Sequence, residues 1–230
     1  MGAAGERRLD ALALVIAGAV DLLAGADAAL LLADGTVASG GDVADRVGWV
    51  SDHADRWRVG WAFWVIVTTT FAWAFYALAR NLGGRRQWRD LAVGAAVLAA
   101  AVDLVGIALN LAALPDLASR LQELDGGARA SVLATYAAME DVARALTDVS
   151  AYGLYTAAGL LLLPGLLDTP GYPRALTVIA SIEWGLAAVV TALLALGSPA
   201  ATGPFAVALV LYVPWAWGSA WWLYSGYQRR

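Results

Sequence analysis

The stretch from Val59 to Leu78, VGWAFWVIVTTTFAWAFYAL, contains no charged residue and decides the class of this protein. Because an α-helix rises about 1.5 Å per residue, about 20 apolar residues cross the hydrocarbon core of a bilayer. Other windows of the chain are similarly long and apolar. The predicted spans are 11–33, 59–79, 91–114, 144–166, 174–197 and 204–226. We therefore expect an all-α, polytopic membrane protein, a bundle of six transmembrane helices that forms one domain over residues 1–230.

The composition supports a membrane protein and excludes several kinds of chemistry. Apolar residues make up 60% of the chain and charged residues 15%, whereas soluble domains have about 25% charged residues. The chain has no cysteine, no lysine and one histidine, which excludes disulfides, thiolate catalysis, a retinal Schiff base and sites that need several imidazoles. We therefore expect no metal site and no cofactor. The net charge of −4 argues against a nucleic-acid partner.

The arginines predict the orientation of the chain. Arg80, Arg85, Arg86 and Arg89 all lie between the second and third predicted spans. Short loops rich in arginine stay on the cytoplasmic side of a membrane. We therefore expect both termini in the cytoplasm, and we place the protein in the cell membrane, which is the inner membrane in a bacterium or archaeon.

The first span has an alternative interpretation as a cleaved signal peptide. Arg7 and Arg8 precede the apolar run, and the small residues 24–26 resemble a cleavage site. Asp21 lies inside the apolar run, however, and an acid there argues against a signal peptide.

Three acids lie near the middle of predicted spans: Asp21, Asp103 and Glu183. An ionised side chain at that depth costs at least about 2.5–3.5 kcal/mol, so such residues usually face the protein interior and carry function. If the three converge in a dry interior, they cannot all stay ionised, and we expect at least one to hold a proton at neutral pH. Asp103 and Glu183 are our candidates for catalytic proton donors or relay groups, and Asp21 is a candidate ligand-binding residue.

Small and polar residues accompany two of these acids on the same helix face. Asp21 lies between Gly18 and Gly25, and Asp103 shares its face with Asn110. Small residues beside an acid allow a second helix to approach closely. We therefore expect these faces to meet other helices, with Asn110 as a further ligand-binding candidate.

The fourth span carries the longest polar stripe, which includes Arg144, Asp148 and Tyr152. Arg144 and Asp148 are four residues apart, so we expect them to pair near the outer end of the span, where a structural role is the commoner one. All three are candidate ligand-binding residues at the mouth of a pocket. The helical pattern begins early, near Arg129 or Ser131, so we expect one long helix whose first turns project from the membrane.

Two tryptophans lie too deep in their spans to belong to an interfacial aromatic belt: Trp64 and Trp215. They are candidate walls of a binding pocket, where their rings would also attract a cation. The alternative is a packing or lipid-facing surface. The longest predicted loop, residues 34–57, contains the single histidine, His53; we interpret it as a solvated loop rather than a metal site.

Several features together resemble a family. They are the order of six spans, the arginine-rich loop, Val102-Asp103-Leu104 in the third span and Gly171-Tyr172-Pro173-Arg174-Ala175-Leu176 before the fifth. The chain resembles, over about residues 70–195, a family of uncharacterised bacterial six-helix integral membrane proteins that is catalogued as a domain of unknown function. The resemblance implies a fold and a location but no activity.

Three functions stay open from the sequence. The first is binding or transport of a small hydrophobic or amphipathic molecule in a pocket of carboxylates and aromatic rings. The second is an intramembrane acid–base enzyme that acts on a lipid or isoprenoid, by analogy with integral-membrane terpene cyclases. The third is an accessory or sensory subunit in which the acids only join helices. The expected partners are membrane lipids, a small hydrophobic ligand and further copies of the chain.

Overall fold

The computed structural model describes residues 3–37 and 40–228, and every regular element in these residues is a helix. Six helical stretches are long and apolar enough to cross a membrane: Gly5–Gly35, Ala54–Ala79, Arg86–Gln122, Gly126–Asp168, Arg174–Ala195 and Gly203–Ser225. The prediction of an all-α, multi-pass membrane protein is confirmed for these residues, and the orientation and the kind of membrane stay predictions.

Several of these stretches combine α-helix with short segments of other helical types. The α-helices are α1 (Ala3–Asp27), α2 (Val43–Asp52), α3 (Ala54–Ala79), α4 (Arg86–Ala108), α5 (Leu114–Gln122), α6 (Gly126–Arg144), α7 (Tyr152–Asp168), α8 (Arg174–Ala195) and α9 (Thr202–Gln228). The π-helical segments are η1 (Ala28–Leu32), η4 (Leu109–Ala113) and η5 (Ala145–Ala151), and the 3₁₀ turns are η2 (Ala33–Gly35) and η6 (Pro199–Ala201).

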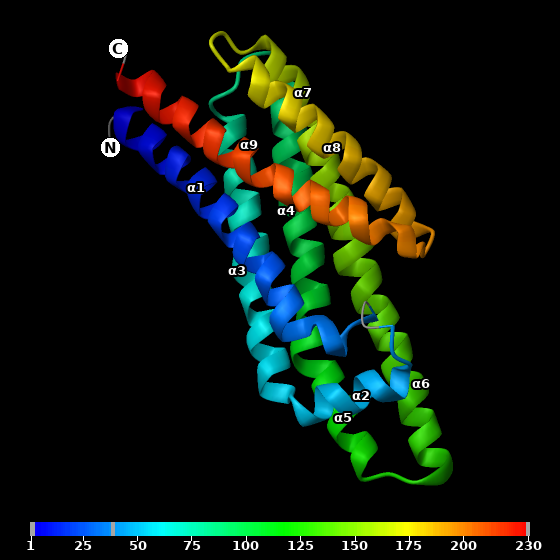
Figure 1. Cartoon of the computed structure of the whole chain (residues 1–230). Coiled ribbons are helices and arrows are strands. Elements are labelled where there is room, and N and C mark those ends of the chain that lie inside the picture. The colour runs from blue at the N-terminus through cyan, green and yellow to red at the C-terminus, as the bar shows by residue number, and fades with distance from the viewer. Residues whose placement is uncertain (1–2, 38–39, 229–230) are drawn as a thin grey trace.

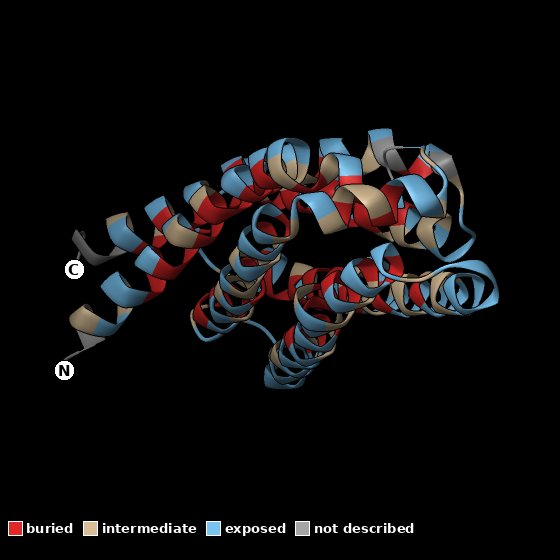
Figure 2. Ribbon diagram, turned by 90° about the horizontal axis from the view of Figure 1, so that it is seen from below, coloured by how far each residue is buried: buried red, intermediate tan, exposed pale blue. Residues whose placement is uncertain are grey.

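The long helices form a closed ring. Going round it, α1 packs on α3, α3 on α4, α4 on α7, α7 on α8, α8 on α9, and α9 returns to α1. In Figure 1, the first and last helices run side by side, and the described ends of α1 and α9 lie at the same end of the bundle. Figure 2 shows that the buried residues gather on the sides of the helices that face one another. The ring therefore surrounds a common interior, to which every long helix contributes a face.

Glycines allow close approach at selected points of the ring. A Cβ atom at Gly18 would lie 2.5 Å from Nε1 of Trp217, so α1 and α9 touch at this residue. At Gly159 an added Cβ would overlap the ring of Trp184. Gly25 has nothing within 4 Å of the position of such an atom. The expectation of a close contact is thus confirmed at Gly18 and wrong at Gly25.

A compact group of short helices covers the end of the bundle opposite to the chain ends (Figure 1). We call this group, made of α2, α5 and α6, the cap. It packs on the ends of η1 and α3, and the buried apolar residues of this cluster are Leu32, Val47, Val50, Trp57, Leu114, Ala118, Leu121 and Tyr136. The prediction of a loop over residues 34–57 is wrong, because Asp42 accepts a hydrogen bond from the N–H of Asp45 at 2.9 Å and starts α2.

The third and fourth spans are longer than predicted. The third continues beyond the expected residue 114 through α5, whose first turn holds Pro115, a residue that helix N-termini accept without loss of a hydrogen bond. The fourth begins at Gly126, where a φ of +54° suits glycine, and runs to Asp168. The prediction of one long fourth helix is confirmed, and its start lies a few residues earlier than expected.

Candidate functional site

The three predicted midplane acids are all buried in the ring. Asp21 of α1 is 3% exposed, Asp103 of α4 is 8% exposed and Glu183 of α8 is 2% exposed. Each lies on a different helix, and each points away from the lipid-facing surface. The prediction that these acids face the protein interior is confirmed.

The acids form two groups rather than one cluster. Asp21 and Glu183 belong to one group, because the charge of Asp21 acts on Glu183 within the interior of the ring. Asp103 instead interacts with Thr68 and with Asp148. We call Asp21 and Glu183 the acid pair, and it is the more deeply buried of the two groups.

The acid pair has no basic partner. Among the described residues, no arginine forms an ion pair with Asp21 or Glu183. Oε2 of Glu183, Nε1 of Trp184 and the hydroxyl of Tyr212 are buried and lack a hydrogen-bond partner among those residues. Leaving a buried polar group unpaired costs about 1–3 kcal/mol, so unpaired groups gathered at one place indicate a site that another molecule completes.

Aromatic rings from four helices of the ring meet beside the acid pair. They are Phe71, Phe75, Tyr155, Trp184, Tyr212 and Trp215, and we call them the aromatic centre. Phe71 stacks on Tyr212 with a centroid distance of 4.5 Å. Trp184 meets the edge of Trp215 at 5.5 Å and an angle of 87°. Trp215 is 2% exposed, so it lies inside the bundle, and its role as a pocket wall stays a prediction.

Hydrogen-bonded hydroxyl groups flank the acid pair on two sides. The Tyr155 hydroxyl lies 2.6 Å from Oγ1 of Thr68 and donates to the Thr68 carbonyl oxygen at 3.0 Å. Elsewhere, the Tyr172 hydroxyl lies 2.7 Å from Oγ of Ser219 and accepts a bond from Nε1 of Trp215 at 3.1 Å. Tyr172 was not predicted as a site residue, because it lies in a turn, outside every helical stripe that the sequence reveals.

Two predicted ligand-binding residues lie away from the acid pair. Nδ2 of Asn110 donates to the Gly106 carbonyl oxygen at 3.0 Å, so this side chain bonds to its own helix at the start of η4. Trp64 donates from Nε1 to Oδ2 of Asp27 at 3.0 Å. Asp27 is a further buried acid that sequence reasoning missed, and its signal was a second acid on the first span.

The residues predicted to form the outer mouth of the pocket are arranged differently from the prediction. Arg144 forms an ion pair with Asp141 at 3.3 Å, and its charge also acts on Asp148 without a direct ion pair between these two side chains. Asp148 is exposed and accepts a bond from Oγ1 of Thr147 at 2.9 Å, which the π-helical winding of η5 permits. Tyr152 is half-buried, and the charges of Asp21 and Glu183 act on it.

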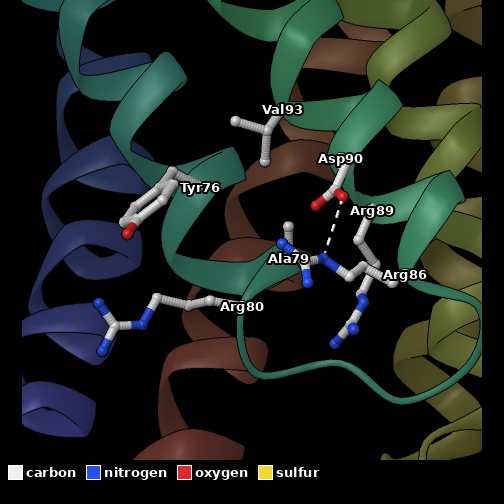
Figure 3. Close-up of a pocket in the computed structure, with 7 residues that line it drawn as sticks. All are labelled: Tyr76, Ala79, Arg80, Arg86, Arg89, Asp90 and Val93. Atoms are coloured by element: carbon white, nitrogen blue, oxygen red, sulfur yellow. Dashed lines mark hydrogen bonds and ion pairs between the residues drawn. The ribbon is translucent and has the colours of Figure 1, made fainter.

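Two hollows of the described structure lie elsewhere. One of about 340 Å³ lies between the ends of α3 and α4, and Figure 3 shows the residues that line it. Another, of about 380 Å³, follows the turn from Ser51 to Arg56. Neither is lined by the acid pair, whose surroundings are filled by aromatic side chains. Among the described residues, no group of three or more histidine and acidic side chains is arranged to hold a metal ion.

No protein-family model, curated protein or solved structure matches this chain. The resemblance to bacterial six-helix membrane proteins therefore stays a prediction.

Proposed function

We propose that this protein is a membrane transporter that exchanges a small amphipathic organic cation for a proton. The observation that carries the proposal is the acid pair, Asp21 and Glu183, which is buried without an arginine beside it. Two carboxylates in a low-dielectric interior do not both stay ionised unless a positive charge neutralises them. A proton and a bound cation can each supply that charge, so the binding of one displaces the other.

The surroundings of the pair favour a cation over other ligands. Aromatic rings carry negative charge on their faces, and Trp184, Trp215 and Tyr212 surround this region. The unpaired Oε2 of Glu183 can accept a hydrogen bond from an ammonium group. Apolar parts of the same molecule would contact the rings, so the site suits an amine or a quaternary ammonium or phosphonium ion with hydrophobic substituents.

Movement is part of this proposal, because the aromatic centre is filled in the present conformation. A bound molecule would take the place of one or more side chains, and the ring of Trp184, which lies directly against Gly159, is the first candidate. The segments η1, η4 and η5 interrupt three of the six spans with π-helical turns. Such turns are frequent at functional sites, and they provide positions where a span can change its winding.

We infer that the proton reaches the surface along a row of polar groups, and that a change of conformation connects it at Tyr212, whose hydroxyl has no hydrogen-bond partner among the described residues. The hydroxyl of Tyr212 interacts with the acid pair and with Tyr155. Tyr155 in turn interacts with Thr68 and Asp103, and Asp103 interacts with the exposed Asp148. Asp103 is therefore assigned to proton transfer, whereas Asp21 and Glu183 are assigned to the exchange site itself.

An intramembrane acid–base enzyme is the alternative, and the same rings favour it. Aromatic faces around a protonated acid would stabilise a carbocation formed from an isoprenoid. The two functions differ in the molecule that leaves, since a transporter releases it unchanged. A purely structural role is less consistent with the site, because interhelical glue requires bonds that Oε2 of Glu183 does not make with any described residue.

The test uses purified protein in liposomes and tetraphenylphosphonium as the probe cation. With a proton gradient imposed, the wild type should accumulate the probe, and dye-monitored proton flux should accompany it. Asp21→Asn and Glu183→Gln should lower both fluxes about a hundredfold. The matched control is Asp116→Asn, because Asp116 is an exposed acid in the cap and should leave both fluxes unchanged.

Two further measurements extend this test: the affinity for the probe as a function of pH, and the effect of Asp103→Asn. Where one proton is displaced, the affinity for the probe should rise about tenfold per pH unit, because protons compete with the cation. Asp103→Asn should retain probe binding and slow proton release. Equal fluxes in the wild type, Asp21→Asn and Glu183→Gln would refute the exchange function, and a chemically altered lipid in the liposomes would favour the enzyme.

A further inference from the structure

A second site lies at the other end of the molecule from the cap, between the ends of α3 and α4. The hollow there has a volume of about 340 Å³ and is lined by Tyr76, Arg80, Arg86, Arg89, Asp90 and Val93, among others. We propose that it binds the phosphate of an anionic phospholipid headgroup. The hollow lies where two membrane-spanning helices end, which is the level at which lipid headgroups meet water.

The start of α4 concentrates positive charge that the protein leaves largely uncompensated. Arg85, Arg86 and Arg89 lie at the first residues of this helix, where the helix dipole is also positive. The first turn has no acidic residue, and the N-cap residue makes no side-chain capping bond. Arginines at this end of a helix repel the dipole unless an anion lies between them.

Arg89 has the geometry of a prepared phosphate ligand. Its Nη1 donates to the carbonyl oxygen of Leu82, which holds the guanidinium in place. Its Nε is buried and lacks a partner among the described residues. A guanidinium that is held at Nη1 keeps its remaining Nη donor for a phosphate oxygen, which accepts charge-assisted hydrogen bonds.

The other charges of the hollow differ in how far they are already neutralised. Arg80 pairs with Asp10 at 3.2 Å and also with Glu6, so it adds little free charge. Arg86 pairs only with Asp90, at 3.2 Å, and both side chains are largely exposed, so this pair is weak and can yield to a phosphate. Figure 3 shows Arg86, Arg89 and Asp90 on α4, facing the end of α3 that carries Tyr76.

Apolar side chains extend from the hollow into the membrane-spanning part of the same two helices. Val93 lines the hollow, Val97 follows one turn later on α4, and Trp73 lies one turn from Tyr76 on α3. Val97, Trp73 and Tyr76 are exposed, which provides a track for an acyl chain beside the headgroup. This continuity favours a phospholipid over free phosphate as the source of the anion.

The test is native mass spectrometry of the full chain in mild detergent, titrated with phosphatidylglycerol. Arg86→Gln and Arg89→Gln should each weaken lipid binding about fivefold, the loss expected for one arginine near a membrane surface. Asp90→Asn should have the opposite effect and strengthen binding, because it removes the only acid that lines the hollow. Arg120→Gln, an arginine of α5 in the cap, is the matched control and should bind as the wild type does.

Further measurements identify the source of the phosphate and check that the variants are folded. Phosphatidylcholine should bind more weakly than phosphatidylglycerol, and inorganic phosphate at millimolar concentration should not displace the lipid. Within the described part of the chain, the Arg86 side chain bonds to Asp90 alone, and both are exposed, so Arg86→Gln should keep the wild-type melting temperature. Displacement by inorganic phosphate would assign the hollow to a free anion. Equal lipid binding by Arg86→Gln, Asp90→Asn and the wild type would overturn the proposal.

Discussion

Two buried sites of this protein contain acidic side chains, and they differ in whether an arginine neutralises the acid. In the cap, Arg46 donates to both carboxylate oxygens of Glu140, at 2.8 and 2.6 Å, and also to the Gly41 carbonyl oxygen. The hydrogen bonds to Glu140 raise the pKa of Arg46 above its ordinary value. In the ring, Asp21 and Glu183 have the same sign of charge and no arginine. The cap pair is complete in itself, whereas the acid pair requires a proton or a cation from elsewhere.

This comparison indicates where stability and function reside. A buried pair with all its bonds made is costly to break, because removing one partner leaves the other charge buried and alone. An acid without a counter-ion already destabilises the folded state, so replacing it with a neutral side chain should raise the free energy of unfolding. Substitutions at the two sites should therefore change the free energy of unfolding in opposite directions.

Breaking the ion pair between Arg46 and Glu140 in the cap should give the largest loss of stability. Arg46→Ala should lower the free energy of unfolding by about 3–5 kcal/mol, because Glu140 is left buried without its partner. Chemical unfolding in detergent, followed by tryptophan fluorescence, measures this change. The double variant Arg46→Met, Glu140→Leu should regain most of it, and a loss below about 1 kcal/mol in the single variant would contradict our interpretation of the cap.

The pH dependence of the cap follows from the raised pKa of Arg46. A cation with a raised pKa in the folded state contributes stability below its unfolded pKa and loses it only above. Arginine titrates far above neutrality, so Arg46 should contribute equally at pH 6 and pH 9. Unfolding of the wild type and of Arg46→Ala at both pH values measures this, and a difference that changes with pH would show that another group titrates in the cap.

Gly159→Ala should give the next largest loss, about 1–3 kcal/mol, because its Cβ would overlap the ring of Trp184 in the aromatic centre. The matched control is Gly25→Ala, where nothing lies within 4 Å and the better helix propensity of alanine should leave stability equal or slightly higher. Thermal unfolding of the two variants compares them directly. If they melt at the same temperature, the Trp184 ring is not held against α7.

Tyr155→Phe should cost about 1 kcal/mol, since it removes the bonds to Thr68 and interhelical hydrogen bonds in membranes are worth about 0.6 kcal/mol each. Tyr224→Phe is the control, because Tyr224 is exposed on α9. Chemical unfolding of both variants under the same conditions measures the difference in their free energies of unfolding. A similar cost in both variants would mean that the Tyr155 hydroxyl does not join α3 to α7.

Glu183→Gln should change stability least, by about 0.5 kcal/mol or less, and the sign should favour the variant. The amide has nearly the same shape and removes a charge that no partner neutralises. Glu140→Gln is the contrasting variant in the cap and should be clearly destabilising. If Glu183→Gln loses as much stability as Glu140→Gln, the acid pair is structural and the exchange function is wrong.

The spans and the inward position of the acids were predictable because bilayer thickness and the cost of a buried charge act on each helix separately. Val59–Leu78 needs no partner to be recognised as a span, and Asp103 needs none to be placed inside. Residues 34–57 were not predictable, because α2 is short and depends on the cap for its burial. The pairing of Arg144 was also missed, since the π-helical winding of η5 changes the spacing that an α-helix would have.

The sequence by itself determined the class of the protein, its six apolar spans and the set of acids that must face inward. These follow from composition and from the dimensions of a bilayer, which are local constraints. Only the tertiary structure decided that the charge of Asp21 acts on Glu183, that Asp103 interacts with Thr68 and Asp148, and that aromatic rings from α3, α7, α8 and α9 fill the centre. These contacts join residues distant in the chain, and they depend on the order in which the helices close the ring.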